Sequence, residues 1–108
     1  MKKIFICSPY RGKNAAERQR NIKYAKAIAR EVALAGGAPY VPHLYLTEIL
    51  DDKNRREREL GIKSGLAFLD DCDEVVVGAY YGISDGMRTE INYAKLIDKK
   101  IKFLTAKP

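Results

Sequence analysis

Cysteine and histidine are scarce in this 108-residue sequence, which contains two cysteines and one histidine. The two thiols, Cys7 and Cys72, cannot supply the several bridges on which small secreted domains depend. With His43 as the single imidazole, no zinc-binding pattern can be written. We therefore expect two semi-buried thiols and no metal. The alternative is a nucleophilic pair of Cys7 with His43, which requires both residues to lie at neighbouring strand ends.

Long apolar runs are also missing. No run approaches the ~18 residues that a membrane-spanning helix needs, and the apolar stretch that follows the first lysines is too short for a signal peptide. Hydrophobic residues make up 46% of the chain and charged residues 31%, which is typical of a soluble globular domain and not of a disordered chain. We expect a single cytoplasmic domain over residues 1–108, with no membrane partner.

Positive charge is concentrated in the first half of the chain. Residues 1–54 hold ten Lys or Arg against five Asp or Glu, whereas residues 55–108 hold ten against nine. Much of the excess lies in one stretch: Lys13, Arg18, Arg20, Lys23, Lys26 and Arg30. Such a helix face can bind nucleic acid, but it is more often a solvated surface. Because the stretch has only Tyr24 for base stacking, nucleic acid is not an expected partner and remains the third alternative.

Apolar runs alternate with amphipathic segments along the chain. β-Branched and aromatic runs predict strands over 2–7, 38–41, 74–79 and 101–104, and apolar residues at helical spacing predict helices over 14–35, 55–70 and 86–97. Asn14 and Glu17 have the spacing of a helix N-cap and its reciprocal partner. Pro42 is expected to close the second strand, and residues 43–56 to form a loop with room for one helical turn over 46–50.

Strands that alternate with helices indicate a parallel sheet with helices on both faces. The predicted fold class is therefore α/β, a flavodoxin-like or Rossmann-type three-layer sandwich with a sheet of four to five parallel strands. Ligands of such sheets bind outside the carboxyl ends of the strands. Candidate functional residues are therefore expected in the loops over 8–12, 42–45 and 80–90.

The first of these loops reads Ser8-Pro9-Tyr10-Arg11-Gly12. A hydroxyl, a guanidinium and a glycine between a strand and a helix suit an anion, because arginine binds phosphate bidentately and the helix start offers free N–H groups. The loop contains neither a Walker A motif nor GxGxxG. An ordinary turn with a surface arginine is the alternative.

The third loop leads into the predicted helix 86–97. Ser84 or Asp85 can cap this helix, and Gly86 allows a ligand to approach its start. Glu90 lies one turn further along. Its carboxylate either complements the helix dipole or faces the crevice as a nucleophile or base, and spacing alone does not decide between the two.

The motifs FICSPYRG, PHL, LDDCDEVVVG and SDGMRTEINYA, in this order over residues 3–105, resemble those of the nucleoside 2-deoxyribosyltransferase-like proteins. That family includes deoxynucleoside 5′-monophosphate N-glycosidases. The resemblance implies a flavodoxin-like fold and cleavage or transfer at the N-glycosidic bond of a nucleoside or nucleotide. It also implies that Glu90 attacks the anomeric carbon, in agreement with the chemistry of retaining glycosyl transfer.

The resemblance further implies how a substrate would be held. Phosphate would be bound by Ser8, Arg11, Gly12 and Ser84. Tyr10 and His43 would shape the pocket for the sugar or base, with Asp85 on the sugar hydroxyls and Gly86 and Met87 completing the binding set. A serine six residues before Glu90, where the nucleoside-using transferases tend to carry aspartate, favours a nucleoside monophosphate. No cofactor is implied, and a homodimer or larger homo-oligomer is expected.

One family feature is missing. Members of the family carry a second acidic residue eight positions before the aspartate that opens the third strand, where it helps to protonate the leaving base. Counting back from Asp73 leads to Gly65 in this chain. Tyr10, Tyr45, Tyr80 or Asp85 are the candidates to replace that acid. The main alternative is therefore a nucleotide-binding or sensing module on the same fold that does not cleave.

Overall fold

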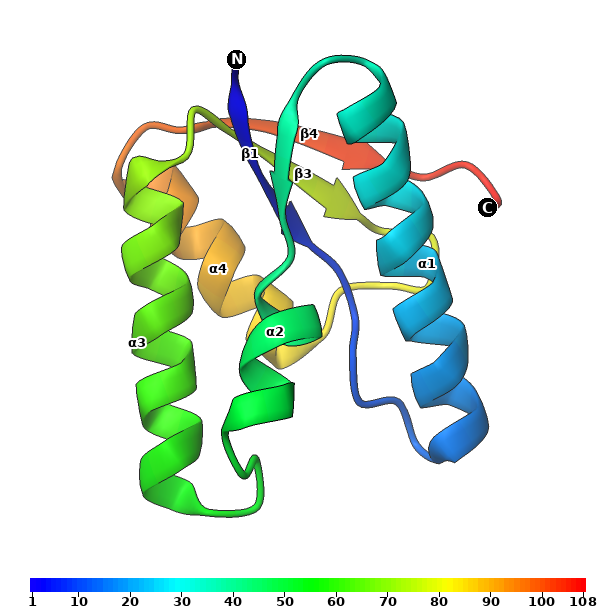
Figure 1. The fold of residues 1–108 in the computed structure, drawn as a ribbon, viewed down its shortest axis with the longest axis vertical. Coiled ribbons are helices and arrows are strands. Elements are labelled where there is room, and N and C mark those ends of the chain that lie inside the picture. Colours follow the sequence, from blue (N-terminus) through cyan, green and yellow to red (C-terminus); the bar gives the residue numbers. More distant parts are fainter.

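Four parallel strands form one sheet in the order β2-β1-β3-β4. The structure is a computed structural model that describes residues 1–108. The strands are β1 (Lys3–Cys7), β2 (Ala38–Tyr40), β3 (Glu74–Gly78) and β4 (Lys100–Leu104), and Figure 1 shows β1 and β3 at the centre. The predicted α/β class with a parallel sheet is confirmed, and the sheet has four strands.

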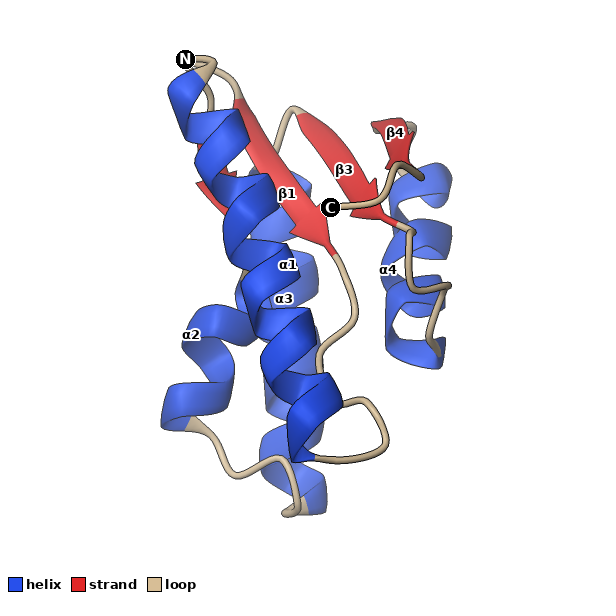
Figure 2. Ribbon diagram, turned by 90° about the vertical axis from the view of Figure 1, so that its right-hand side faces the viewer, coloured by secondary structure: helices blue, strands red, loops and turns tan.

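Four helices join the strands: α1 (Ala15–Leu34), α2 (Pro42–Ile49), α3 (Arg55–Asp71) and α4 (Asp85–Leu96). Successive strand residues point to opposite faces of the sheet, so the buried runs of β1 and β3 serve two cores. Phe5, Cys7 and Val75 pack with α3 and α4, whereas Ile6 and Val76 pack with α1. Figure 2 shows α1 in front of β1, on the face opposite α4.

The helix α2 corrects the prediction for residues 43–56, which were expected to be a loop with a turn over 46–50. The helix begins at Pro42, which occupies a first-turn position and has no side-chain cap before it. Proline is compatible with a strand end and equally with a helix start, where its missing N–H needs no partner. The sequence pattern around Pro42 therefore marks the end of the strand but does not show that a helix begins there.

The loop between β1 and α1 is held by a cap and by a glycine. Asn14 caps α1 by accepting from the N–H of Glu17 at 2.9 Å, as predicted. The reciprocal bond differs from the prediction, because Glu17 accepts from the N–H of Lys13, one residue earlier than the cap. Gly12 has a φ of +65°, and a Cβ there would lie 2.5 Å from the Glu17 Cβ. Glycine is therefore required for this turn.

The basic residues of α1 do not share one environment. Arg18, Lys23, Lys26 and Arg30 are exposed, whereas Arg20 is half-buried and its guanidinium lies 3.9 Å from the centre of the Tyr81 ring. The Arg20 side chain thus turns away from the exposed face of α1 and contacts the loop that follows β3. None of the helices combines the length and apolar character that crossing a bilayer requires.

Gly78→Ala is expected to lower the free energy of unfolding by about 1–3 kcal/mol, the usual effect of overpacking a core. A Cβ at Gly78 would lie 2.6 Å from Ile28 Cδ1 and 2.9 Å from Tyr24 Cε2, both on α1. Gly86→Ala is the matched control, because a Cβ there meets nothing within 4 Å. Urea denaturation of both variants measures the difference, and equal stabilities would contradict the close approach of α1 to β3.

Candidate active site

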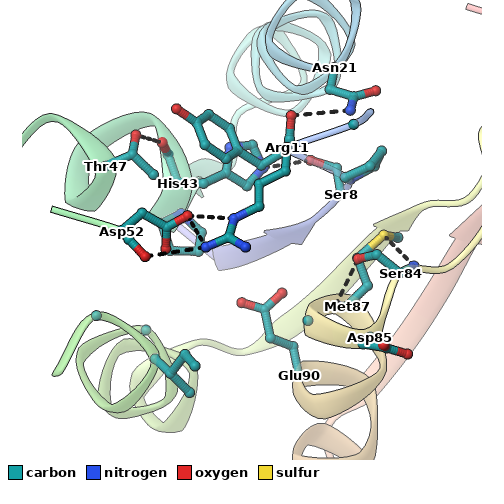
Figure 3. Close-up of a pocket in the computed structure, with 18 of the residues that line it drawn as sticks. Ser8, Arg11, Asn21, His43, Thr47, Asp52, Ser84, Asp85, Met87 and Glu90 are labelled. Carbon is teal, nitrogen blue, oxygen red and sulfur yellow. Dashed lines mark hydrogen bonds and ion pairs between the residues drawn. The ribbon is translucent and has the colours of Figure 1, made fainter. Parts of the chain in front are cut away.

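A cavity of about 620 Å³ opens at the carboxyl ends of β1 and β3, lined by the β1–α1 loop, α2, α3 and the start of α4. Its volume suits a small-molecule ligand. The loops expected to carry function therefore do meet at one place (Figure 3). All ten residues predicted to act in catalysis or binding line this cavity: Ser8, Tyr10, Arg11, Gly12, His43, Ser84, Asp85, Gly86, Met87 and Glu90. Tyr45 and Tyr80, two of the candidates to replace the missing acid, are exposed and lie outside it.

Glu90 projects from α4 into the cavity, as Figure 3 shows. Its side chain is half-buried, and burial raises its pKa from 4.5 to about 7, opposed in part by the neighbouring Cys7 thiol. A carboxylate that only complemented the helix dipole would lie in water and keep its ordinary pKa. The geometry therefore favours the crevice-facing role, with both protonation states accessible near neutral pH.

Cys7 lies beneath Glu90 at the end of β1 and is fully buried. Its thiol lies 3.6 Å from the carbonyl oxygen of Met87, to which it donates, and burial together with the neighbouring Glu90 raises its pKa. The thiol is therefore held protonated, whereas a nucleophilic cysteine needs a thiolate. The alternative of a Cys7–His43 pair is wrong, because the imidazole contacts a different partner.

That partner is Ser8, whose Oγ lies 3.0 Å from His43 Nε2. The His43 Nδ1 atom is buried without any partner, and burial lowers the pKa of His43 to about 4. The imidazole is therefore neutral near neutral pH. The Tyr10 ring packs against it at a centroid distance of 5.3 Å, so that Ser8, His43 and Tyr10 form one continuous wall of the cavity.

Arg11 reaches across the cavity to the loop between α2 and α3. Its guanidinium pairs with the Asp52 carboxylate and donates to the Asp52 carbonyl oxygen at 3.3 Å. This half-exposed ion pair offsets the positive charge that a phosphate would use. Sequence reasoning missed Asp52, because nothing local marks a residue that lies 41 positions from its partner.

The start of α4 holds the remaining predicted residues. Ser84 caps the helix by accepting from the Met87 N–H at 3.2 Å, and the Ser84 N–H lies 3.4 Å from Met87 Sδ. Asp85 pairs with Arg88 at 3.0 Å and its side chain is fully exposed. The structure therefore does not bring the Asp85 carboxylate to Glu90. Gly86 leaves open space beside the first turn.

The helix α3 presents no acid to the cavity at the position where the family resemblance led us to look for one. Gly65 is buried and lines the cavity, and the nearest atom to a Cβ built there is Pro42 Cβ at 3.7 Å. Two other lining carboxylates, Glu17 and Glu57, each accept from a backbone N–H. No group of three potential metal-ligating side chains gathers in the structure.

A network of Arg20, Asn21 and Tyr81 closes the cavity on the α1 side. Arg20 donates through Nε and Nη2 to Asn21 Oδ1 at 3.2 and 3.0 Å. Asn21 is 1% exposed and donates to the Tyr10 carbonyl oxygen at 3.1 Å. Sequence reasoning grouped Arg20 with the exposed basic residues of its helix. In the sequence, the only sign that this face of α1 is buried is the set of small apolar residues that follow Asn21 at helical spacing.

Comparison with known proteins shows the family of the chain and a fold shared with solved enzymes. A family model described as "Domain of unknown function (DUF7768)" matches residues 2–104. No curated protein matches the chain. A solved 2-deoxyribosyltransferase from Bacillus psychrosaccharolyticus is 18% identical, with a TM-score of 0.67 over 94% of this chain and 70% of that one. The Clostridium botulinum CMP N-glycosidase BcmB is 17% identical, with a TM-score of 0.57 over 94% and 67%. Both show a shared fold.

Glu90→Gln is expected to stabilise the protein more at about pH 8 than at about pH 4.5. Folding raises the pKa of Glu90 to about 7, so between 4.5 and 7 the folded chain keeps a proton that the unfolded chain has lost. The protonated Glu90 carboxyl therefore makes its full contribution to the free energy of unfolding at the lower pH, and this contribution is lost as the pH rises through 7. Compared with Glu90→Gln, the wild type therefore loses about 3 kcal/mol of its free energy of unfolding over this pH range.

Urea denaturation of the wild type and the variant at both pH values measures this effect. Glu48→Gln, at an exposed position of α2, supplies the comparison for a carboxylate outside the cavity. A Glu90→Gln effect of the same size at both pH values would show that Glu90 is not buried as described.

Proposed function

The chain belongs to the DUF7768 family, and we propose that it cleaves or transfers at the N-glycosidic bond of a (deoxy)nucleoside 5′-monophosphate. The observation that carries the proposal is Glu90, a half-buried carboxylate that points into the cavity at the carboxyl ends of the sheet. Ligands bind there in parallel α/β sheets. Its raised pKa is the kind of perturbation that marks functional carboxylates.

The two related structures support the chemistry without deciding it. One is named as a 2-deoxyribosyltransferase and the other as a CMP N-glycosidase, and both activities act at the bond between a sugar and a base. Because one fold hosts many functions, this support has weight only together with a carboxylate in the cavity.

The proposed reaction begins with the ionised form of Glu90. One carboxylate oxygen bonds to the anomeric carbon while the bond from that carbon to the base nitrogen breaks, and its electron pair leaves with the base. The base takes up a proton from water or from a side chain of the cavity. Water, or the nitrogen of a second base, then attacks the anomeric carbon of the glycosyl ester and releases Glu90 as a carboxylate.

The neutral wall opposite Glu90 suits the sugar and base. The His43 imidazole is uncharged near neutral pH, and its Nε2 atom is bound to Ser8, so the ring adds no charge to this wall. Tyr10 offers an aromatic face beside it. These groups would orient a nucleoside without placing a second charge beside the reacting carbon.

A nucleotide-binding module that does not cleave is the second candidate. Gly65 favours it, because this cavity-lining residue supplies no acid where the related enzymes are expected to carry one. Without a proton donor the base is a poor leaving group, and general acid catalysis contributes typically ~10²–10⁴-fold in rate. The module would bind nucleotides through the same cavity and release no base.

Base release from nucleoside 5′-monophosphates is expected for the wild type and not for Glu90→Gln. The amide cannot form the glycosyl ester, so the rate should fall by at least about a thousandfold. Chromatography of free base, with ribo- and deoxyribonucleotides and with or without an acceptor base, measures this. Glu48→Gln, outside the cavity, should keep the wild-type rate. Release at equal rates by wild type and Glu90→Gln would rule out Glu90 as the nucleophile, and no release from any nucleotide would favour the binding module.

Gly65→Asp is expected to raise the rate of base release by about tenfold or more, by supplying the missing acid. The cavity has room, since the nearest neighbour of a new Cβ is 3.7 Å away. Gly65→Ala is the matched control, because it adds the Cβ without the carboxyl. If both variants change the rate equally, the missing acid is not what limits the chain, and the proton comes from another group.

A further inference from the structure

Three arginines line the cavity. Arg58 is exposed on α3, whereas Arg11 and Arg20 lie beside the β1–α1 loop and differ in how their charge is compensated. Arg11 is paired with the Asp52 carboxylate. Arg20 makes no ion pair, and its two hydrogen bonds go to the amide oxygen of Asn21. An amide is neutral, so the full positive charge of Arg20 remains available, whereas an anion that approaches Arg11 also meets the negative charge of Asp52.

Arg20 is held in a single orientation. Its guanidinium lies over the Tyr81 ring at 3.9 Å, and two of its five N–H groups are bound to Asn21. Three donors therefore remain, two on Nη1 and one on Nη2. The contact with the Tyr81 ring and the two bonds to Asn21 reduce the side-chain entropy that would be lost when an anion binds.

The two anchors of Arg20 are tied to two of the loops that line the cavity. Asn21 donates to the Tyr10 carbonyl oxygen in the β1–α1 loop, and Tyr81 belongs to the β3–α4 loop, three residues before the Ser84 cap. Asp85 and Gly86, the first two residues of α4, line the same cavity. A cation without a carboxylate partner and the positive end of a helix dipole thus face the same cavity, and both favour an anionic group.

We propose that Arg20, held by Tyr81 and Asn21, is the residue that selects a phosphate-bearing ligand in this cavity, and that Arg11 is secondary. The ligand class is a nucleoside 5′-monophosphate, so this inference rests on the proposed function for the identity of the ligand. It does not rest on catalysis, because an anion can bind here whether or not Glu90 attacks a sugar.

Binding is best measured in the Glu90→Gln background, where no turnover consumes the probe. Calorimetry with CMP, dCMP, the matching nucleosides and inorganic phosphate compares Arg20→Gln with the parent. Arg18→Gln is the matched control, because Arg18 is exposed on the same helix and lies outside the cavity. Arg20→Lys keeps the charge without the fork, and Tyr81→Leu removes the platform while leaving the arginine.

Arg20→Gln is expected to weaken monophosphate binding about 10- to 100-fold, the range for a charged hydrogen bond, and to change nucleoside binding less than about twofold. Arg18→Gln should leave both unchanged. Arg20→Lys and Tyr81→Leu should fall between the parent and Arg20→Gln, with the loss again confined to the phosphate-bearing probes.

Equal losses for monophosphate and nucleoside would overturn the inference, because Arg20 would then only support the fold. A parent protein that binds no monophosphate more tightly than its nucleoside would overturn it as well. If monophosphate binding depends on Arg20 but the wild type releases no base, the inference stands and the cleavage proposal fails. If the wild type instead releases base from nucleosides and shows no preference for monophosphates, cleavage at the glycosidic bond stands and the inference about Arg20 fails.

Discussion

The parallel pairing of β1 with β3 is the constraint on which the rest of the structure depends. The register places Cys7 beside Val77, so both strands end at one edge of the sheet and their following loops open into one cavity. Phe5, Ile6 and Cys7 are completely buried, and shifting β1 by one residue would turn all three to the opposite face. A core that cannot slip therefore positions Ser8 on one side of the cavity and Ser84 on the other.

The cavity that results is electrostatically uneven. Burial holds Glu90 close to its protonation midpoint near neutral pH, and burial holds His43 neutral. The Arg11 charge is offset by Asp52, while that of Arg20 is not offset by any carboxylate. A ligand with a neutral sugar and base and one anionic group matches this distribution, which is the physical reason to consider a nucleotide before a nucleoside or an extended polyanion.

The Gly65 position separates the two functions that this cavity can serve. The fold shared with a deoxyribosyltransferase and an N-glycosidase supplies the cavity and its loops, but a fold does not determine an activity. In the proposed reaction Glu90 is the nucleophile, and Gly65 stands where an acid would assist the leaving base. Cleavage in this chain depends on whether water or another side chain can supply the proton.

The sequence by itself determined the four strands, three of the four helices and ten of the residues around the cavity, because period and turn residues are local properties. Local pattern failed at Pro42, which suits a strand end and a helix start alike. Only the tertiary structure decided which partner each side chain meets. Ser8 bonds to His43 across 35 positions and Arg11 to Asp52 across 41, and Arg20 leaves the exposed face of its helix for Tyr81. Such pairings depend on how elements pack in space, and neither spacing nor composition encodes that packing locally.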